Sequence, residues 1–478
     1  MRKRFMVPVL AAAVMILASG CGSEAGRKAA INEPVTITVW HYYNGVQKEE
    51  FDELVRSFNE TEGREKGIIV EAQSKGGVDE LSQMVEDSLE KKIGSDPLPD
   101  VFAAYADKVY EIDQKGMAVD LSQYLTEQEQ SEYVDAYIEE GKFDEGQGLK
   151  VLPVAKSTEV FAINKTDWDK FAEATGESEA AFSTWEGITR VAEAYYKWTD
   201  SLTETPEDGR AFFGRDAFAN YIIIGSLQLG HEIFQVENGK PVMDFDRTAM
   251  KRLWDNYYVP YVNGYFASYG KFRSDDVKTG QLAAFVGSTS GMTYFPSSVT
   301  LEDGTNYEIE NKVYPLPNFT GTTPCAVQQG AGMMVLKSEK KREQAAVEFL
   351  KWFTEQKQNI AFSIDSGYLP VMKKANDFST IESSTTIQSD LMKEVIETSV
   401  NTVNTKNLYT TKAFDNGAKL RTELEECLKN KATNDRKTVV QAINEGKNID
   451  SLWSLYDSQD YFDEWYQETY QVLKDIVG

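Results

Sequence analysis

The chain has 478 residues, of which 41% are hydrophobic and 26% are charged, and its formal net charge at pH 7 is −26. A chain of this length is long enough to bury the cores of two or more domains. Its negative charge, with no group of lysine and arginine residues beyond the N-terminal tip that would form a basic stripe, argues against a nucleic-acid-binding protein.

The first predicted element is an export signal. A basic tip at residues 2–4 precedes an apolar run at residues 5–18, and small residues then lead to Cys21. The run is too short to span a bilayer comfortably, so the pattern is typical of a bacterial lipoprotein signal peptide, residues 1–20, whose cleavage leaves Cys21 as the lipidated first residue. The alternative is a plain secretory signal followed by a chance cysteine. Removing residues 1–20, which carry three positive charges, changes the formal charge from −26 to −29.

Residues 21–34 are small, polar and without a pattern, which predicts a flexible tether. The globular part is predicted to begin at Val35 with a strand of alternating apolar residues. The order from there is strand, helix, strand, helix, strand, at residues 35–40, 51–58, 67–72, 78–93 and 96–105. This order predicts a mostly parallel sheet covered by helices. Ligands of such sheets lie at the carboxyl ends of the strands, which places residues 40–44 and 105–107 at a cleft edge.

A second domain is predicted after a break in the pattern near residues 149–154. An apolar strand at residues 160–164 follows, and the next long span is rich in helix, tryptophan and tyrosine. Later elements are an apolar strand running into a small polar loop, glycines followed by an apolar strand, a helix with an apolar stripe and a helical aromatic tail, at residues 280–291, 328–336, 345–353 and 453–470.

Cysteine and histidine are scarce. Beyond Cys21 only Cys325 and Cys427 remain, too few for a fold built on disulfides, and the sequence leaves open whether these two pair. Two histidines, His41 and His231, argue against a Ser-His-Asp hydrolase and against a histidine-rich metal site, and a packed or surface role is favoured for His41. Walker-type, G-x-G-x-x-G, G-x-S-x-G and HExxH motifs are missing from the sequence. No metal or organic cofactor is therefore predicted.

Short segments along the chain, each weak alone, match one family in their order and spacing. They are residues 37–40 (ITVW), 99–102 (PDVF), 152–153 (LP), 157–159 (STE), 163–165 (INK), 283–287 (AAFVG), 345–350 (AAVEFL) and 366–371 (SGYLPV). The chain resembles the extracellular solute-binding proteins of bacterial ABC importers, the group that includes maltose-, oligosaccharide- and glycerol-3-phosphate-binding proteins. The resemblance extends from Val35 to about Asn430.

The resemblance implies an α/β, two-lobed, periplasmic-binding-protein-like fold of type II, with the ligand in the cleft between the lobes. The lobes would comprise residues 35–155 plus 326–370, and residues 156–325 plus 371–478. The chain would cross between them near residues 150–156, 326 and 371. Closure of the lobes around the ligand is a hinge motion, and the transporter would sense the closed form.

The resemblance also places the ligand-binding residues on the loops that line the cleft. Aromatic rings suit the apolar faces of sugars, and hydroxyl and amide groups suit their hydroxyls. The expected residues are Trp40, Tyr42, Tyr43, Tyr105, Ser157, Thr158, Glu159, Ser288, Thr289, Ser290, Gln329, Gly330, Tyr368 and Arg421. A packing or hinge role is the alternative for each of them, and Gly330 in particular is suited to a backbone conformation that other residues avoid.

The sequence leaves the class of ligand open. Many maltose-type relatives carry a tryptophan where residues 288–290 stand here, which argues against a long maltodextrin. In the glycerol-3-phosphate branch, Arg421 would pair with a phosphate, whereas the competing interpretation is a helix-surface pair of Arg421 with Glu425. A secreted glycoside hydrolase with two carboxylates is a rival class, but no local motif identifies either carboxylate.

The function that the resemblance implies is an extracellular substrate-binding subunit, not an enzyme, that captures a mono- or oligosaccharide. Its expected partners are the sugar, the transmembrane permease subunits of an ABC transporter and the membrane, through the lipid on Cys21, with no nucleic acid. The protein is expected to be a monomer, anchored to the cell membrane and facing the extracellular side or the periplasm. A lipid-anchored sensor or adhesin that binds without transport is the other alternative.

Overall fold

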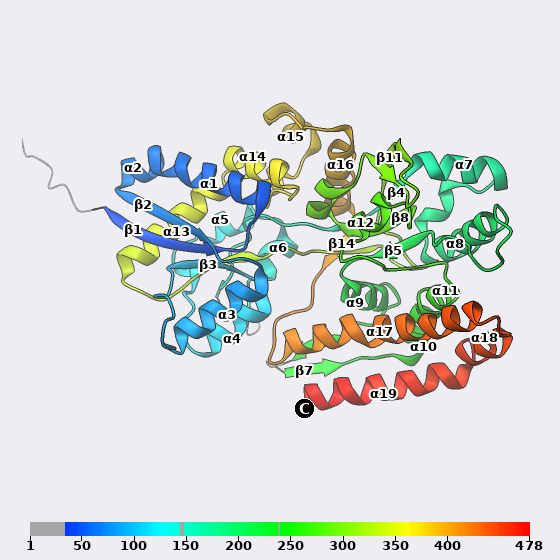
Figure 1. The fold of residues 1–478 in the computed structure, drawn as a ribbon. Coiled ribbons are helices and arrows are strands. Elements are labelled where there is room, and N and C mark those ends of the chain that lie inside the picture. Colours follow the sequence, from blue (N-terminus) through cyan, green and yellow to red (C-terminus); the bar gives the residue numbers. More distant parts are fainter. Residues whose placement is uncertain (1–33, 144–147, 238–239) are drawn as a thin grey trace, which may run out of the picture.

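A computed structural model describes residues 34–143, 148–237 and 240–478. The expected signal peptide, residues 1–20, and the expected lipidation site, Cys21, lie outside the described residues, as does most of the tether. Among the helices of the described part, none is long and apolar enough to cross a membrane. The described chain forms two lobes that lie side by side, each with its own sheet and helices (Figure 1).

The first lobe is built on a four-stranded sheet in the order β13-β3-β1-β2. Its strands are β1 (Val35–His41), β2 (Ile68–Ser74), β3 (Val101–Ala104) and β13 (Gly332–Val335). β1 pairs in parallel with β2 and β3, and β13 pairs antiparallel with β3. The predicted alternation of strands and helices is thus confirmed, with one antiparallel strand added from late in the chain.

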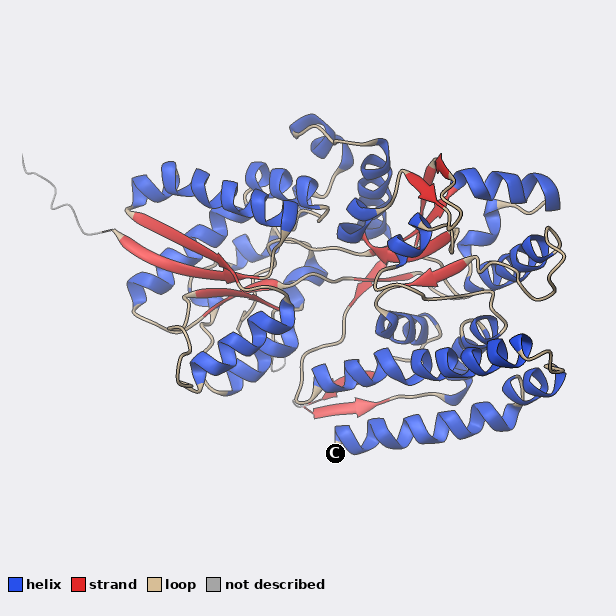
Figure 2. Cartoon of the chain, viewed as in Figure 1, coloured by secondary structure: helices blue, strands red, loops and turns tan. Residues whose placement is uncertain are grey.

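Helices cover both faces of this sheet (Figure 2). They are α1 (Gly45–Glu60), α2 (Glu62–Lys66), α3 (Val78–Leu89), α4 (Ala106–Gln114), α5 (Glu127–Ser131), α6 (Asp135–Glu139), α13 (Lys340–Thr354) and α14 (Gln356–Ser366). On α1, the spacing of Phe51, Leu54, Val55 and Phe58 predicts one apolar face, and these are its buried residues. The Phe51 ring packs on rings of α13 and α14, which joins distant parts of the chain into one core.

The second lobe has a mixed four-stranded sheet in the order β11-β4-β8-β5. Its strands are β4 (Glu159–Asn164), β5 (Phe213–Arg215), β8 (Ala284–Ser288) and β11 (Asn311–Pro315). All six residues of β4 are buried, because antiparallel partners flank it on both sides and helices cover it. Short two-stranded sheets join β6 (Phe234–Glu237) with β7 (Lys240–Met243) and β9 (Ser298–Thr300) with β10 (Asn306–Glu308).

Most of the helices of the second lobe come from two stretches of the chain. They are α7 (Lys165–Thr175), α8 (Trp185–Asp200), α9 (Phe218–Gln228), α10 (Arg247–Asp255), α11 (Tyr258–Val262), α12 (Arg273–Lys278), α17 (Gly417–Asn444), α18 (Asp450–Tyr456) and α19 (Gln459–Val477). The long α17 lies across α9 and α11 and buries Leu420, Leu424 and Leu428 at helical spacing. The aromatic tail packs as predicted, with Phe462 and Trp465 against Trp254.

Several extended segments connect the lobes. Isolated antiparallel bridges join Leu152 with Met333, Lys156 with Leu369 and Ser157 with Gln329. Beside them, β12 (Cys325–Val327) pairs in parallel with β14 (Asn407–Tyr409). These segments, near the predicted crossings, form the link between the lobes.

The stretch between the last crossing and β14 packs on both lobes. The short η4 (Lys373–Ala375) and α15 (Phe378–Ser384) contact α14 of the first lobe. The next helix, α16 (Asp390–Thr405), packs against β11 and β4 of the second lobe. The cysteine question left open by the sequence is answered here, since Cys325 and Cys427 are both free thiols.

Candidate functional site

Two neighbouring cavities lie between the lobes. The larger one, of about 630 Å³, is lined from the first lobe by α3, α4 and Glu140, and from the second lobe by the start of α9 and by α17. The smaller one, of about 470 Å³, is lined by Tyr42, by Tyr368 of the SGYLP segment (residues 366–370) and by the loops around α12 and after β8. Both cavities share Tyr105, Ala217 and Gln329, so they form one continuous cleft, which is called the interlobe cleft below.

Most of the residues that the sequence proposed for the site line this cleft. The small cavity is lined by Tyr42, Tyr105, Ser157, Ser288, Ser290, Gln329, Gly330 and Tyr368, and the large cavity by Tyr105, Gln329 and Arg421. They come from segments far apart in the sequence, which the crossing segments and the ends of β1, β3, β4 and β8 bring together. The carboxyl ends of the strands therefore do face the cleft, as the strand order predicts.

The remaining proposed residues do not line the cleft. Trp40 is buried within β1, with the Lys75 Nζ 4.2 Å from its ring centroid. Tyr43 packs into the core of the first lobe against Phe51 and Phe362. Contrary to the expectation that they face a ligand, these two rings are packed in the core of the first lobe, and of the three aromatic residues only Tyr42 lines the cleft.

Thr158, Thr289 and Glu159 lie behind the cleft wall rather than on it. The Thr158 hydroxyl donates to the Val327 carbonyl at 2.7 Å, and the Thr158 carbonyl accepts from the Thr289 amide at 2.9 Å. Thr289 is 1% exposed. These contacts tie β4, the start of the loop after β8 and the crossing segment at β12 together, so the two threonines are packing residues of the link.

Glu159 belongs to a buried ionic network. Arg215 Nη2 donates to both carboxylate oxygens of Glu159, at 3.0 and 2.9 Å, and both side chains are 1% exposed. Asn220 Nδ2 donates to Glu159 Oε1 at 2.8 Å. The charge of Glu159 is thus compensated within the second lobe, which corrects its expected role as a residue that touches the ligand.

Arg421 lines the large cavity and does not pair with Glu425, its neighbour on α17. Its Nη2 donates to Asn220 Oδ1 at 2.5 Å. Glu425 instead accepts from the Ala219 amide at 2.7 Å and pairs with Lys429 at 3.3 Å. The helix-surface pair of Arg421 with Glu425 is therefore not formed, because Glu425 caps the N-terminus of α9 and Arg421 is held over the cavity.

The serine loop after β8 is ordered by its own hydrogen bonds. Ser288 is the N-cap of η3 (Thr289–Tyr294), and its hydroxyl accepts from the Gly291 amide at 3.1 Å. The Ser290 hydroxyl lies 3.2 Å from that of Ser288. Both hydroxyls are positioned at the wall of the small cavity before any ligand arrives.

The titratable groups at the cleft are shifted mainly by burial. Burial raises the pKa of Asp107 to about 6, against the attraction of Arg421, which lowers it. Burial, and then neighbouring phenols, raise the pKa of Tyr42 and Tyr368 far above the ordinary value, so both hydroxyls remain donors at neutral pH. The buried His41 has its pKa lowered to about 4 by burial and is a neutral core residue.

Sequence reasoning missed several residues of the cleft. Asp216, Phe272, Asp275 and Tyr294 line the small cavity. Phe272 is 52% exposed and Tyr294 is 68% exposed, which is unusual for large rings and was not visible from spacing. Asp107, which lines the large cavity, was placed at the cleft edge because it follows the predicted third strand directly, but it was not among the proposed ligand-binding residues.

A second buried charge pair lies at the link and joins Lys156, at the start of the second lobe, to Glu140 of the first lobe. Lys156 Nζ lies 2.6 Å from Glu140 Oε2 and donates to the Gly330 carbonyl at 2.7 Å. Gln328 Nε2 donates to the same carboxylate oxygen at 2.8 Å. Glu140, which lines the large cavity, is thereby held by both crossing segments.

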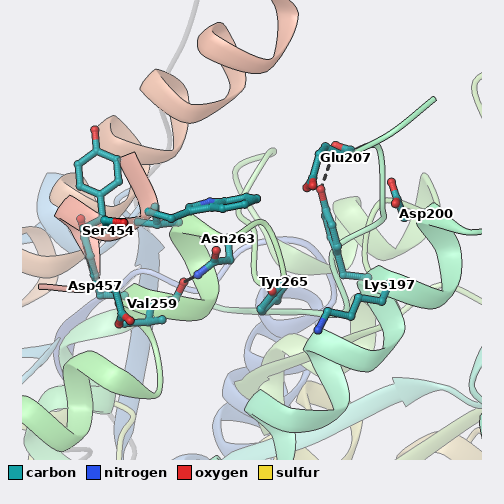
Figure 3. Close-up of a pocket in the computed structure, with 13 residues that line it drawn as sticks. Lys197, Asp200, Glu207, Val259, Asn263, Tyr265, Ser454 and Asp457 are labelled. Carbon is teal, nitrogen blue, oxygen red and sulfur yellow. Dashed lines mark hydrogen bonds between the residues drawn. The ribbon is translucent and has the colours of Figure 1, made fainter. Parts of the chain in front are cut away.

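A further cavity of about 600 Å³ lies within the second lobe alone (Figure 3). It opens between α8, α11 and α18, and Lys197, Asp200, Asn263, Tyr265 and Asp457 are among its lining residues. Polar groups at its wall are bonded within the lobe, as in the bond from Asn263 Nδ2 to the Val259 carbonyl at 2.9 Å. No strand end and no first-lobe residue is among the described residues that line it, so the interlobe cleft is the better candidate site. In the described part of the chain, no group of three or more His, Cys, Asp or Glu residues is arranged to hold a metal.

A comparison with protein families finds one that matches most of the chain. The family described as bacterial extracellular solute-binding protein matches residues 53–392. A comparison with curated proteins finds no significant sequence match.

Solved structures of similar fold cover almost all of the chain. The cyclic α-maltosyl-1,6-maltose binding protein from Arthrobacter globiformis is 18% identical, with a TM-score of 0.65, over 92% of this chain and 100% of that one. UgpB from Mycobacterium tuberculosis, in complex with glycerophosphocholine, is 20% identical, with a TM-score of 0.63, over 86% and 98%. The maltotriose binding protein from Thermus thermophilus is 17% identical, with a TM-score of 0.59, over 92% and 100%. These likenesses confirm the predicted two-lobed α/β fold.

Proposed function

The chain belongs to the bacterial extracellular solute-binding protein family, and from that premise we propose that it captures a carbohydrate and delivers it to the membrane permease of an ABC importer. The observation that supports a sugar as the ligand is the set of residues that line the interlobe cleft. Rings of Tyr42, Tyr105, Phe272, Tyr294 and Tyr368 stand beside serine hydroxyls and the Gln329 amide. Such a surface matches the apolar faces and the hydroxyls of a sugar.

The charge of the cleft favours a neutral sugar over a phosphate ester. The large cavity is lined by the acids Asp79, Glu86, Asp107, Glu140 and Glu425 and by the bases Lys108 and Arg421, and the small one by Asp216 and Asp275 without any base among its described lining residues. Lys108 already pairs with Glu86 and with Glu111. A phosphate would therefore enter a region of net negative charge with Arg421 as its main cation. A phosphodiester is the second candidate ligand, because UgpB, which has a similar fold, was solved in complex with glycerophosphocholine. The experiment below distinguishes a phosphodiester from a neutral sugar.

The proposed capture step is closure of the lobes. We assign residues 35–155 plus 326–370 to the first lobe and residues 156–325 plus 371–478 to the second lobe. Because α15 contacts α14 of the first lobe, residues 378–384 are better counted with the first lobe. Walls from both lobes contact one ligand only when the cleft is shut, so binding favours the closed form. The extended pairs at residues 152–157 and 329–333 are the proposed hinge.

A thermal-shift screen of the purified protein tests the proposal. The probes are maltose, maltotriose, lacto-N-biose, glycerophosphocholine and glycerol-3-phosphate. A sugar at a hundredfold its dissociation constant stabilises the folded form by about 2.7 kcal/mol, which raises Tm visibly. Tyr368→Ala, in the cleft, is expected to lose the shift, whereas the matched control Tyr265→Ala, in the other cavity, keeps it.

Each outcome of the screen is informative. A shift with the phosphate esters alone would replace the sugar by a glycerophosphodiester, and a shift that Tyr265→Ala abolishes would move the site to the second lobe. No shift with any probe would contradict the carbohydrate proposal. Because the family consists of binding proteins, we propose no enzymatic activity, and release of monosaccharide from maltotriose during incubation would contradict this.

The proposed place of the protein is the outer side of the cell membrane, where a lipid on Cys21 holds it as a monomer. The acidic body favours attachment by the lipid, since it is repelled by anionic headgroups. Cys21→Ser is expected to move the protein from the membrane fraction to the medium. An unchanged distribution between the two fractions would contradict the anchor.

A further inference from the structure

We propose that Asn220 is a positioning residue that sets the polarity of the interlobe cleft, so that the groups of the solute that reach Arg421 and Gln329 must be hydrogen-bond acceptors. The proposal rests on the proposed function, because it concerns the same cleft. Asn220 itself does not line either cavity; it is 1% exposed and lies in the first turn of α9, directly behind the wall.

The side chain of Asn220 joins three segments of the chain. Its Nδ2 donates to Glu159 Oε1 at 2.8 Å and to Gln329 Oε1 at 3.1 Å, and its Oδ1 accepts from Arg421 Nη2 at 2.5 Å. Glu159 belongs to β4, Gln329 to a crossing segment and Arg421 to α17. One buried amide thus connects the sheet of the second lobe, the link between the lobes and the long helix at the cleft.

The direction of each bond follows from which groups can only donate or only accept. Arg215 offers only donors and is bonded to both carboxyl oxygens of Glu159, so both of these oxygens act as acceptors. The group of Asn220 that faces Glu159 must then be its NH₂, and its carbonyl oxygen must face Arg421. Because the side chains of both Arg215 and Glu159 are 1% exposed, water does not compete for these bonds.

The orientation of the Asn220 amide also determines which atoms of Gln329 and Arg421, on the cavity wall, have a hydrogen-bond partner. The amide NH₂ of Asn220 takes up the oxygen of Gln329, which leaves Gln329 Nε2 as the end of that side chain without a partner in the described chain. Arg421 uses Nη2 for Asn220 and forms no salt bridge with any described carboxylate. The hydrogen-bonding groups of these two side chains that have no partner in the described chain are therefore all donors.

The backbone holds both groups in place. The backbone of Gln329 forms two hydrogen bonds with the backbone of Ser157, at 2.8 and 2.9 Å, which fix the position of its Cα. Glu425 accepts from the Ala219 amide at the N-terminus of α9, which fixes α17 against α9 one turn beyond Arg421. A preorganised pair of donors costs little entropy when a solute binds. Hydroxyl, ether and carbonyl oxygens meet this requirement, and an ammonium group does not.

An isosteric variant tests the polarity. Gln329→Glu keeps the shape and the bond from Asn220 but replaces the Nε2 donor by an acceptor oxygen. It is expected to weaken binding of the tightest probe of the screen, maltotriose or lacto-N-biose, by about tenfold or more in isothermal titration. Binding that is unchanged or tighter would mean that the sugar presents a donor here, and would overturn the inference.

A double-mutant cycle tests the positioning role. Asn220→Ala is expected to weaken binding about tenfold in the wild-type background and less than about twofold in an Arg421→Ala/Gln329→Ala background. Asn256→Ala, which removes another buried asparagine of the same lobe that contacts Thr189 and Arg252, is the matched control and should leave affinity unchanged. Equal losses in both backgrounds would make Asn220 a purely structural residue.

A readout without any sugar separates this inference from the proposed function. In the nitrogen NMR spectrum, the guanidinium resonances of Arg421, identified by their loss in Arg421→Ala, are expected to shift and broaden in Asn220→Ala and to stay in place in Asn256→Ala. If no probe of the screen binds but this change is seen, the network stands and the carbohydrate proposal fails. Unperturbed Arg421 resonances in a folded Asn220→Ala variant would overturn the positioning role.

Discussion

Among the single residues of the cleft, Asp107 is the one whose charge depends most on the fold. It lies in the first turn of α4, and a Cβ placed on Gly417 of α17 would approach its Oδ1 to 3.0 Å, so the two lobes nearly touch here. Burial raises its pKa to about 6, and Arg421 opposes this only in part. A carboxyl group with a raised pKa in the folded state binds a proton that the unfolded state has lost. Its contribution to stability therefore falls as pH rises from about 4 to about 6.

Asp107→Asn is expected to remove the decrease in stability that the raised pKa of Asp107 causes as pH rises. The difference in unfolding free energy between the variant and the wild type should move in favour of the variant by about 2–3 kcal/mol from pH 4 to pH 7 and stay constant above. Urea unfolding at a series of pH values measures it. Asp275→Asn, an exposed carboxylate of the small cavity, is the control and should parallel the wild type. Parallel curves for Asp107→Asn would show that burial of this group is slight.

At the scale of elements, the link between the lobes depends on close backbone approach. Gly330 has φ of +98°, and a Cβ there would lie 3.0 Å from the Ala155 carbonyl oxygen and 3.3 Å from the Lys156 Cα. Its own carbonyl accepts from Lys156 Nζ. The crossing segments are thus packed backbone to backbone, with a buried cation between them. This explains why glycine stands here and why the hinge has so little room for side chains.

Gly330→Ala is expected to destabilise the protein by about 2–4 kcal/mol, because strain at positive φ adds to a clash with a neighbouring backbone. Gly321→Ala is the matched control, since Gly321 has φ of +78° but no neighbouring atom within 4 Å of the point that an added Cβ would occupy. It should cost only about 1 kcal/mol. Unfolding in urea gives both values. Equal costs would show that the crossing segments separate easily, which a hinge under no packing constraint would do.

At the scale of the whole molecule, each lobe has its own apolar core and sheet, and the cleft residues are contributed by both. The lobes are therefore compact bodies joined by short extended segments and by the stretch from η4 to α16, which packs on both lobes. Relative motion is then concentrated at the link, because the cores resist deformation.

Binding of a sugar is expected to make the molecule more compact. Small-angle X-ray scattering should show a smaller radius of gyration with saturating maltotriose or lacto-N-biose, whichever binds in the screen, than without it. The Tyr368→Ala variant should show no such decrease at the same concentration. A bound sugar without compaction would mean that the cleft is already closed before binding, and that recognition by the permease depends on another feature.

The strands and helices near the N-terminus could be predicted because their patterns are local. Alternation in residues 35–40 and the stripe at Phe51, Leu54, Val55 and Phe58 encode which side is apolar. The order of strands and helices, with the family segments, then determined the α/β two-lobed fold. A strand at residues 328–336 in the first lobe was expected, but its antiparallel pairing with β3, as β13, could not be seen in that pattern.

The sequence by itself thus determined the fold class, the family and the loops that form the cleft, since these follow from local periodicity and from short motifs at the ends of strands. Only the tertiary structure decided which side chains on those loops face the cleft: Tyr42 does, whereas Trp40 and Tyr43 are buried. It also decided that Arg421 contacts Asn220 across 201 positions rather than Glu425 four positions away. The physical reason is that a side chain's direction and partner depend on the surfaces packed against it, and those surfaces come from distant parts of the chain that no local pattern brings together.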